Sequence, residues 1–240
     1  MTTTVATRSF TACLVGAIIS ATAALAQGGS QAPLFSIDFS DYQPGSGSIR
    51  EWLVAKGFES EHNIRDPDAI VASFKDGSLK IKTEAPAFRL IYLRRDVPDV
   101  ARIRITWGVT RFPANASYEH KINNEALMVY VSFGHDKLPS GSWFVPDSPY
   151  FIGMSLCDQD PIERPFIGQY YEKGGRFVCL GHPEPGARVT TEFDLASAFK
   201  SYFGTARVPA VSGISLEVDT TESGDRGRAA AFINRIDLLK

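Results

Sequence analysis

The sequence has 240 residues, of which 44% are hydrophobic, and it carries 25 basic and 27 acidic side chains. This length and apolar content suffice for one domain of about 200 residues or two small ones, and they exclude a mainly disordered chain. A formal net charge of −2 argues against nucleic acid as the main partner. Three cysteines are too few for a miniprotein built on disulfides.

Residues 1–26 have the features of a secretory signal peptide. Arg8 supplies a positive charge, residues 10–25 are apolar or small, and the segment ends in the small-x-small pattern Ala-Leu-Ala. A retained membrane anchor is the alternative, but an anchor needs about 20 predominantly apolar residues, and this stretch contains polar ones. We therefore expect residues 27–240 to form a single exported domain, periplasmic or secreted, without a membrane span.

Removal of the signal peptide leaves two cysteines, Cys157 and Cys179. An even pair in an oxidising compartment favours a disulfide, and two unpaired buried thiols are the alternative. The histidines show no metal-binding spacing, which disfavours zinc; they are His62, His120, His135 and His182.

The dominant period along the mature chain is two, which is typical of strands with one buried face. Strands are predicted at residues 34–39, 79–83, 89–93, 103–110, 127–133, 150–156, 175–180, 214–219 and 230–238. Glycine- and proline-containing turns separate them. One short helix is predicted between Asp194, which can cap it, and Gly204, which can end it. These elements predict an all-β fold, an antiparallel β-sandwich of jelly-roll type with one short helix.

Three parts of the chain carry a resemblance to a known family. They are residues 88–93 with 103–109, residues 123–133, and residues 194–204 with 211–220. From about Phe74 onward the chain resembles the bacterial secreted family catalogued as domain of unknown function 3047. The resemblance implies a β-sandwich of the kind found in carbohydrate-binding and glycosidase proteins, with no established activity. The family's acidic pair is Asn123-Asn124 here, so no cation site carries over at that position.

Residues 217–222 fit the pattern E-x-D-x-x-E, which resembles the catalytic strand of laminarinase-like retaining glycosidases. The resemblance implies that Glu217 is the nucleophile, that Asp219 tunes it, and that Glu222 is the acid/base. Retaining enzymes hold two carboxyls about 5–5.5 Å apart, so Glu222 needs a β-bulge to return to the face of Glu217. A solvated turn is one alternative, and a calcium site made of Asp219, Glu222 and Asp225 is another.

Aromatic side chains can stack on sugar rings while their polar groups stay wet. Trp107 alternates in register with aliphatic residues and is expected in the core. The candidate ligand contacts lie in loops or opposite the aliphatic faces of strands; they are Trp143, Tyr130, Tyr171, Asn123, Asn124 and Glu125.

The sequence favours an exported, non-catalytic binding module for a glycan or cell-envelope polymer. A retaining glycoside hydrolase that uses Glu217, Asp219 and Glu222 is the first alternative, and a structural or assembly partner in the cell envelope is the second. No cofactor is expected unless the acidic residues bind calcium.

Overall fold

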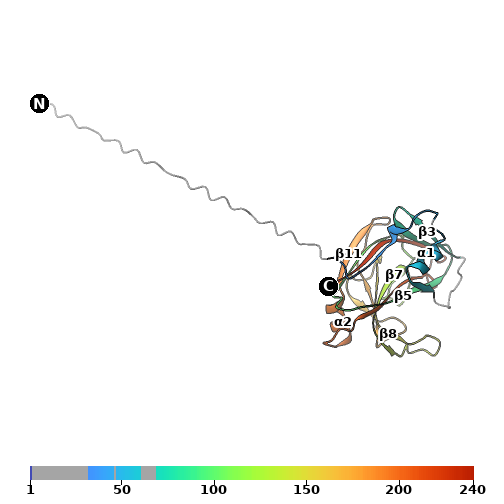
Figure 1. Ribbon diagram of the computed structural model, residues 1–240. Helices are drawn as coiled ribbons and strands as arrows, with labels where there is room; N and C mark the ends of the chain where they lie inside the picture. Colours follow the sequence, from blue (N-terminus) through green and yellow to red (C-terminus); the bar gives the residue numbers. More distant parts are fainter. Residues whose placement is uncertain (2–31, 46, 61–68) are drawn as a thin grey trace. The chain divides into compact units, whose positions relative to one another are not determined.

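The computed structural model describes Met1 and residues 32–45, 47–60 and 69–240, and residues 31–240 form one compact unit. The predicted signal peptide and His62 lie outside the described residues. The elements can be followed by colour in Figure 1. The strands are β1 (Phe35–Asp38), β2 (Phe58–Ser60), β3 (Ile70–Lys75), β4 (Ser78–Thr83), β5 (Phe88–Val97), β6 (Arg102–Arg111), β7 (Glu125–Leu138), β8 (Ser148–Ser155), β9 (Pro165–Phe166), β10 (Gly175–Cys179), β11 (Val189–Asp194), β12 (Val211–Asp219) and β13 (Ala229–Leu239).

The strands form two sheets. The first has the order β11-β6-β13-β4-β3, with β1 also paired to β13, and the second has the order β2-β5-β12-β7-β8-β10-β9. Within the described residues, β8 and β10 pair in parallel and the other named pairs are antiparallel. The predicted all-β sandwich of jelly-roll type is thereby confirmed.

The core lies between the two sheets and is built from the alternating residues of their inner faces. On β6, Ile103, Ile105 and Trp107 are buried, and on β7 the same holds for Val129 and Val131. All five belong to one apolar cluster that joins both sheets. The prediction that Trp107 is a core residue is confirmed.

Two helices are present in the described residues, where the sequence predicted one. The predicted helix is α2 (Leu195–Phe203), capped by the Asp194 carboxylate and ended by Gly204 at a φ of 66°. The additional helix is α1 (Ile49–Ala55). It begins with a capping box, in which Ser48 and Glu51 satisfy each other's backbone N–H groups, at 3.2 and 2.6 Å.

The seven-stranded sheet carries a second apolar cluster on its outer face, the face turned away from the sandwich core. We call it the aromatic cluster; it consists of Met128, Phe151, Phe166 and Phe177, with Tyr118, Tyr130 and Tyr171 packed against them. The Tyr118 ring stacks on Phe177 at 4.7 Å, and the Tyr130 ring meets Phe151 edge-on at 5.4 Å. The outer face of this sheet is therefore covered by aromatic side chains over β7, β8, β9 and β10.

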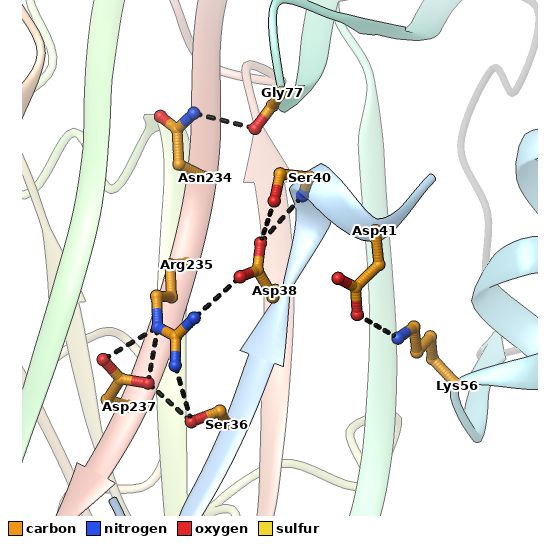
Figure 2. Close-up of polar contacts among 9 residues, drawn as sticks. All are labelled: Ser36, Asp38, Ser40, Asp41, Lys56, Gly77, Asn234, Arg235 and Asp237. Atoms are coloured by element: carbon orange, nitrogen blue, oxygen red, sulfur yellow. Dashed lines mark hydrogen bonds and ion pairs between the residues drawn. The ribbon is translucent and has the colours of Figure 1, made fainter. Parts of the chain in front are cut away.

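Polar contacts join the first strand to the last one. Figure 2 shows Arg235 on β13 between two carboxylates. Its Nη1 donates to Asp38 Oδ2 at 2.7 Å, and its Nε donates to both oxygens of Asp237 at 2.8 and 3.0 Å. Ser36 donates to Asp237 at 2.6 Å. We call these four residues the Arg235 cluster. They join β1 to β13.

Candidate carboxyl-pair site

A β-bulge in β7 brings two glutamates together on the outer face of the seven-stranded sheet. In the pairing of β12 with β7, Glu217 lies opposite Met128, whereas Asp219 lies opposite Glu125. Two steps along β12 thus correspond to three along β7, and the extra residue is accommodated by Ala126 and Leu127, which both face the core. The bulge reverses the alternation and turns Glu125 to the same face as Glu217.

Tyrosine hydroxyl groups hold both glutamates. Tyr118 donates to Glu125 Oε2 at 2.9 Å, and Tyr130 donates to Glu217 Oε1 at 2.5 Å. Glu125 Oε1 is buried and has no hydrogen-bond partner among the described residues, and the nearby side chain of Glu217 raises the pKa of Glu125. Burial beside a second carboxyl group disfavours a negative charge, so Glu125 favours its protonated form. We call Glu125 and Glu217 the carboxyl pair.

Burial is the main reason why this proton stays on the pair. Glu125 is only 3% exposed. Burial, followed by the negative charges of Glu217 and Asp219, raises the pKa of Glu125 well above its ordinary value. Burial and the charge of Glu217 likewise raise the pKa of Tyr130, so this phenol keeps its proton and remains a donor. The site therefore combines a buried carboxyl group of raised pKa with a second carboxyl group, and each accepts a hydrogen bond from a tyrosine.

The three acidic residues of the E-x-D-x-x-E pattern separate in the structure. Glu217 and Asp219 share a face, as expected, but β12 ends at Asp219 and no bulge follows it. Glu222 lies in the next turn with its side chain exposed, and only its backbone N–H reaches the site, donating to Asn124 Oδ1 at 3.0 Å. The second carboxyl beside Glu217 belongs to Glu125, because a turn that leaves the sheet cannot return Glu222 to its face.

The predicted calcium ligands do not form a compact oxygen cluster. Asp225 forms an ion pair with Arg111, and Asp219 Oδ1 accepts from the backbone N–H and the hydroxyl of Thr221 at 2.8 and 2.6 Å. In the described part of the chain, Cys157, Cys179 and His182 form the one group of three potential metal ligands whose donor atoms all lie within 4.8 Å of one another. Asp219, Glu222 and Asp225 are not such a group.

The predicted disulfide between Cys157 and Cys179 is present. It accounts for the proximity of these sulfurs to His182 without a metal, since disulfide sulfurs are not thiolate ligands. His182 Nε2 donates instead to the backbone carbonyl of Asp160, at 2.7 Å.

Among the described residues, no helix is long and apolar enough to cross a membrane.

The predicted ligand contacts fall into two groups. Trp143 is 92% exposed in the loop between β7 and β8, and the neighbouring Phe144 is 84% exposed. Tyr171 lies beside this loop and donates to the Pro146 carbonyl at 2.9 Å. The second group lies in or beside the carboxyl-pair site and consists of Tyr130, Asn123, Asn124 and Glu125.

Tyr130 does not form the exposed platform that its strand position suggested. Its ring is packed against Phe151 and Phe177. Asn124 and Glu125 are buried, and Asn123 is half-buried. Loops that fold over the outer face remove these side chains from water, which a strand pattern by itself does not reveal.

Two important residues of the site, Tyr118 and Asp160, were not predicted from the sequence. Both lie in loops, where periodicity carries no signal. A signal for Glu125 was available, because a charged residue occupies a position in register with the core residues Leu127 and Val129. Such a residue predicts either a buried charge or a bulge.

No family model matches the sequence, and no curated protein matches it. The resemblance to the domain of unknown function 3047 family therefore stays a prediction. The chain is similar in fold to the xyloglucanase domain of NopAA from Sinorhizobium fredii, at 11% identity and a TM-score of 0.40, over 86% of this chain and 99% of that one.

Two further structures are similar in fold. The family GH12 endoglucanase 3 of Trichoderma harzianum is 10% identical, with a TM-score of 0.36, over 75% of this chain and 89% of that one. The agarase AgWH50C is 8% identical, with a TM-score of 0.34, over 85% of this chain. The chain spans 25% of the agarase's length.

Proposed function

We propose that this protein hydrolyses a glycosidic bond with the carboxyl pair, Glu125 acting as general acid and Glu217 as nucleophile. The observation that carries the proposal is the bulge in β7, which turns Glu125, buried and of raised pKa, to the same face as Glu217. β-Bulges are over-represented next to active sites, where they re-aim side chains. Two carboxyls of unequal proton affinity are the groups that glycoside hydrolysis requires.

The proposed reaction has two steps. In the first, the Glu217 carboxylate bonds to the anomeric carbon, the glycosidic C–O bond breaks, and Glu125 transfers its proton to the leaving oxygen. In the second, Glu125 takes a proton from water, the resulting hydroxide displaces Glu217 from the anomeric carbon, and both carboxyls return to their initial state. A retaining pair lies about 5–5.5 Å apart, and the scissile bond of the entering sugar has to lie between the two glutamates.

Two substitutions test the two roles. Glu217→Gln should abolish the release of reducing ends from soluble xylan, xyloglucan, agarose and carboxymethyl cellulose, and also the cleavage of aryl glycosides. Glu125→Gln should lower polysaccharide hydrolysis by about 10²–10⁴-fold, since this is the usual contribution of a general acid. It should spare aryl glycosides that have a good leaving group, because such a group needs no protonation.

Glu222→Gln is the matched control, because Glu222 is exposed in the turn beyond β12. It should leave hydrolysis unchanged. If the wild-type protein releases no reducing ends from any of these probes, or if Glu222→Gln is as damaging as Glu217→Gln, the proposal is wrong.

A non-catalytic glycan-binding role is the second candidate, and a specific observation favours it. The loop that carries the exposed Trp143 and Phe144 is held by internal hydrogen bonds. Ser140 donates to the Val145 carbonyl at 2.6 Å and accepts from the Ser142 N–H at 3.1 Å. An aromatic surface that is rigid before binding loses little conformational entropy when a sugar stacks on it.

Retention on insoluble polysaccharides tests this role. Trp143→Ala should reduce retention on cellulose, xylan or agarose beads at least 10-fold, whereas Val71→Ala, which alters another exposed apolar side chain, should not. Retention without release of reducing ends would favour the binding module over the hydrolase. Either role suits an exported protein, periplasmic or secreted, because the disulfide fits an oxidising compartment.

A further inference from the structure

The carboxyl pair lies beneath a tight turn, which we call the Tyr118 turn and define as residues 117–122. Ser117 and Ile122 close it with two backbone hydrogen bonds of 2.9 Å. Tyr118 extends from the turn to Glu125, and its ring stacks on Phe177. The cavity beside Glu125 has a volume of only about 10 Å³, which is room for about one water molecule. A sugar therefore reaches Glu125 only when this turn moves.

The carboxylate of Asp160 accepts three hydrogen bonds from the Tyr118 turn. Its Oδ1 accepts from the Ser117 hydroxyl at 2.6 Å and from the Glu119 N–H at 3.3 Å, and its Oδ2 accepts from the Tyr118 N–H at 2.8 Å. Asp160 is only 4% exposed. A buried carboxylate with three donors from one short turn is a strong and directional hold on that turn.

The backbone of Asp160 is itself held in place. His182 donates to the Asp160 carbonyl at 2.7 Å, and Cys157 Sγ lies 3.3 Å from the same oxygen. The Cys157–Cys179 disulfide joins the loop that contains Asp160 to β10. A continuous series of contacts thus runs from β10 through Asp160 and Tyr118 to Glu125.

We infer that Asp160 is a positioning residue: its buried carboxylate holds the Tyr118 turn over Glu125 and so controls access to this member of the carboxyl pair. Its importance for hydrolysis rests on the proposed function, but the positioning itself does not. The three contacts of Asp160 exist in the substrate-free protein and can be tested without any glycan.

Asp160→Asn is the central variant, since it replaces one acceptor oxygen by an NH₂ donor that faces N–H or O–H donors. In hydrogen–deuterium exchange of the folded protein, it should speed deuterium uptake of peptides from residues 113–124 at least 10-fold. Asp158→Asn removes a neighbouring, exposed carboxylate and should leave this uptake unchanged. If Asp160→Asn does not fold, Ser117→Ala removes one of the three contacts and should act in the same direction more weakly.

The apparent pKa of the carboxyl pair gives a second readout, which a merely structural role would not move in the same way. It can be followed by the infrared band of the protonated acid, identified by its loss in Glu125→Gln. Asp160→Asn should lower this pKa, because an opened turn admits water to the pair. Tyr118→Phe should raise it, because it keeps the cover and removes a donor that favours the ionised form.

Opposite shifts in the two variants, together with faster uptake in Asp160→Asn alone, support the inference. Unchanged uptake in Asp160→Asn, or a pKa that rises as in Tyr118→Phe, overturns it. Neither readout requires hydrolysis, so an inactive wild-type protein would contradict the proposed function and leave this test intact.

Discussion

The two clusters of carboxyl groups, one on each sheet, lie in opposite electrostatic surroundings. In the Arg235 cluster, Asp38 and Asp237 both accept from one guanidinium group (Figure 2). Burial acts to raise the pKa of Asp38, but hydrogen bonds from Ser40 and the charge of Arg235 hold it below its ordinary value. In the carboxyl pair, burial and neighbouring negative charges raise the pKa of Glu125. The first arrangement favours the ionised form of Asp38, and the second favours the protonated form of Glu125.

This difference separates structural acids from functional candidates more clearly than sequence position does. Asp38 and Asp237 lie near the two ends of the chain and join β1 to β13, which is a structural task. Glu125 and Glu217 lie on adjacent strands, and Glu125 is buried beneath a turn. Burial of an ionisable group costs free energy, and groups with strongly shifted pKa values are concentrated at functional sites. Variants in each cluster test whether the two groups of acids differ in this way.

The largest effect is expected from removal of the disulfide, which lies beside the carboxyl pair. Cys157 and Cys179 are 22 positions apart, and a loop of this size corresponds to about 3 kcal/mol of unfolding free energy. The double variant Cys157→Ser/Cys179→Ser should lose about this amount in urea denaturation without reductant. Deuterium uptake should rise in residues 113–124 and not in β1. A loss below about 0.5 kcal/mol would contradict the expectation.

The next effect concerns the pH dependence of stability, in which the two clusters should differ in sign. Because the folded protein holds the Glu125 proton more tightly than the unfolded chain, stability should fall as the pH rises above the ordinary glutamate value of 4.5. For one proton the slope is about 1.4 kcal/mol per pH unit, up to the folded pKa. Glu125→Gln should remove this decline in urea titrations between pH 4 and 8.

The Arg235 cluster supplies the opposite slope as an internal comparison. The pKa of Asp38 is lowered, so its contribution is present above the ordinary aspartate value of 3.8 and is lost as the pH falls through the folded pKa. Asp38→Asn should therefore flatten the acid side of the stability curve and leave the neutral side unchanged. Identical curves for Glu125→Gln and Asp38→Asn would remove the contrast between the clusters.

The smallest effect is expected from the loss of the guanidinium group. Arg235→Ala leaves the buried Asp237 carboxylate with Ser36 as its remaining donor among the contacts described above. The expected loss is about 1 kcal/mol of unfolding free energy at pH 7, reduced by solvent screening because the Arg235 side chain is 40% exposed. Arg94→Ala breaks a more exposed ion pair with Glu59 and serves as the matched control. Equal losses in the two variants would contradict a specific role for the cluster.

Much of the fold was predictable from local patterns. Alternating apolar residues identified β4, β6, β7 and β12, and cap residues identified α2, since side-chain direction and capping depend on near neighbours. The helix α1 was missed even though Ser48 and Glu51 form a recognisable capping box. The β3 strand was also missed, although Ile70, Ala72 and Phe74 alternate with the outward residues of this strand.

The candidate site was predictable only in part. Glu217 and Asp219 were identified as acidic residues on one strand face, and this placement agrees with the structure. The partner of Glu217 was expected five positions further along the chain, whereas the structure brings Glu125 from the adjacent strand. Tyr118 and Asp160 contribute through loops, and loop positions depend on contacts distant in sequence.

The sequence by itself determined the β-sandwich class, the residues of its core and the pair of cysteines that forms the disulfide. These properties follow from the alternation of apolar and polar residues and from residue chemistry, and both depend on residues that are close in the sequence. Only the tertiary structure decided which carboxyl group faces Glu217 and what covers the pair. A single extra residue in β7 reverses the side-chain alternation, and this reversal becomes visible only when β7 is paired with β12.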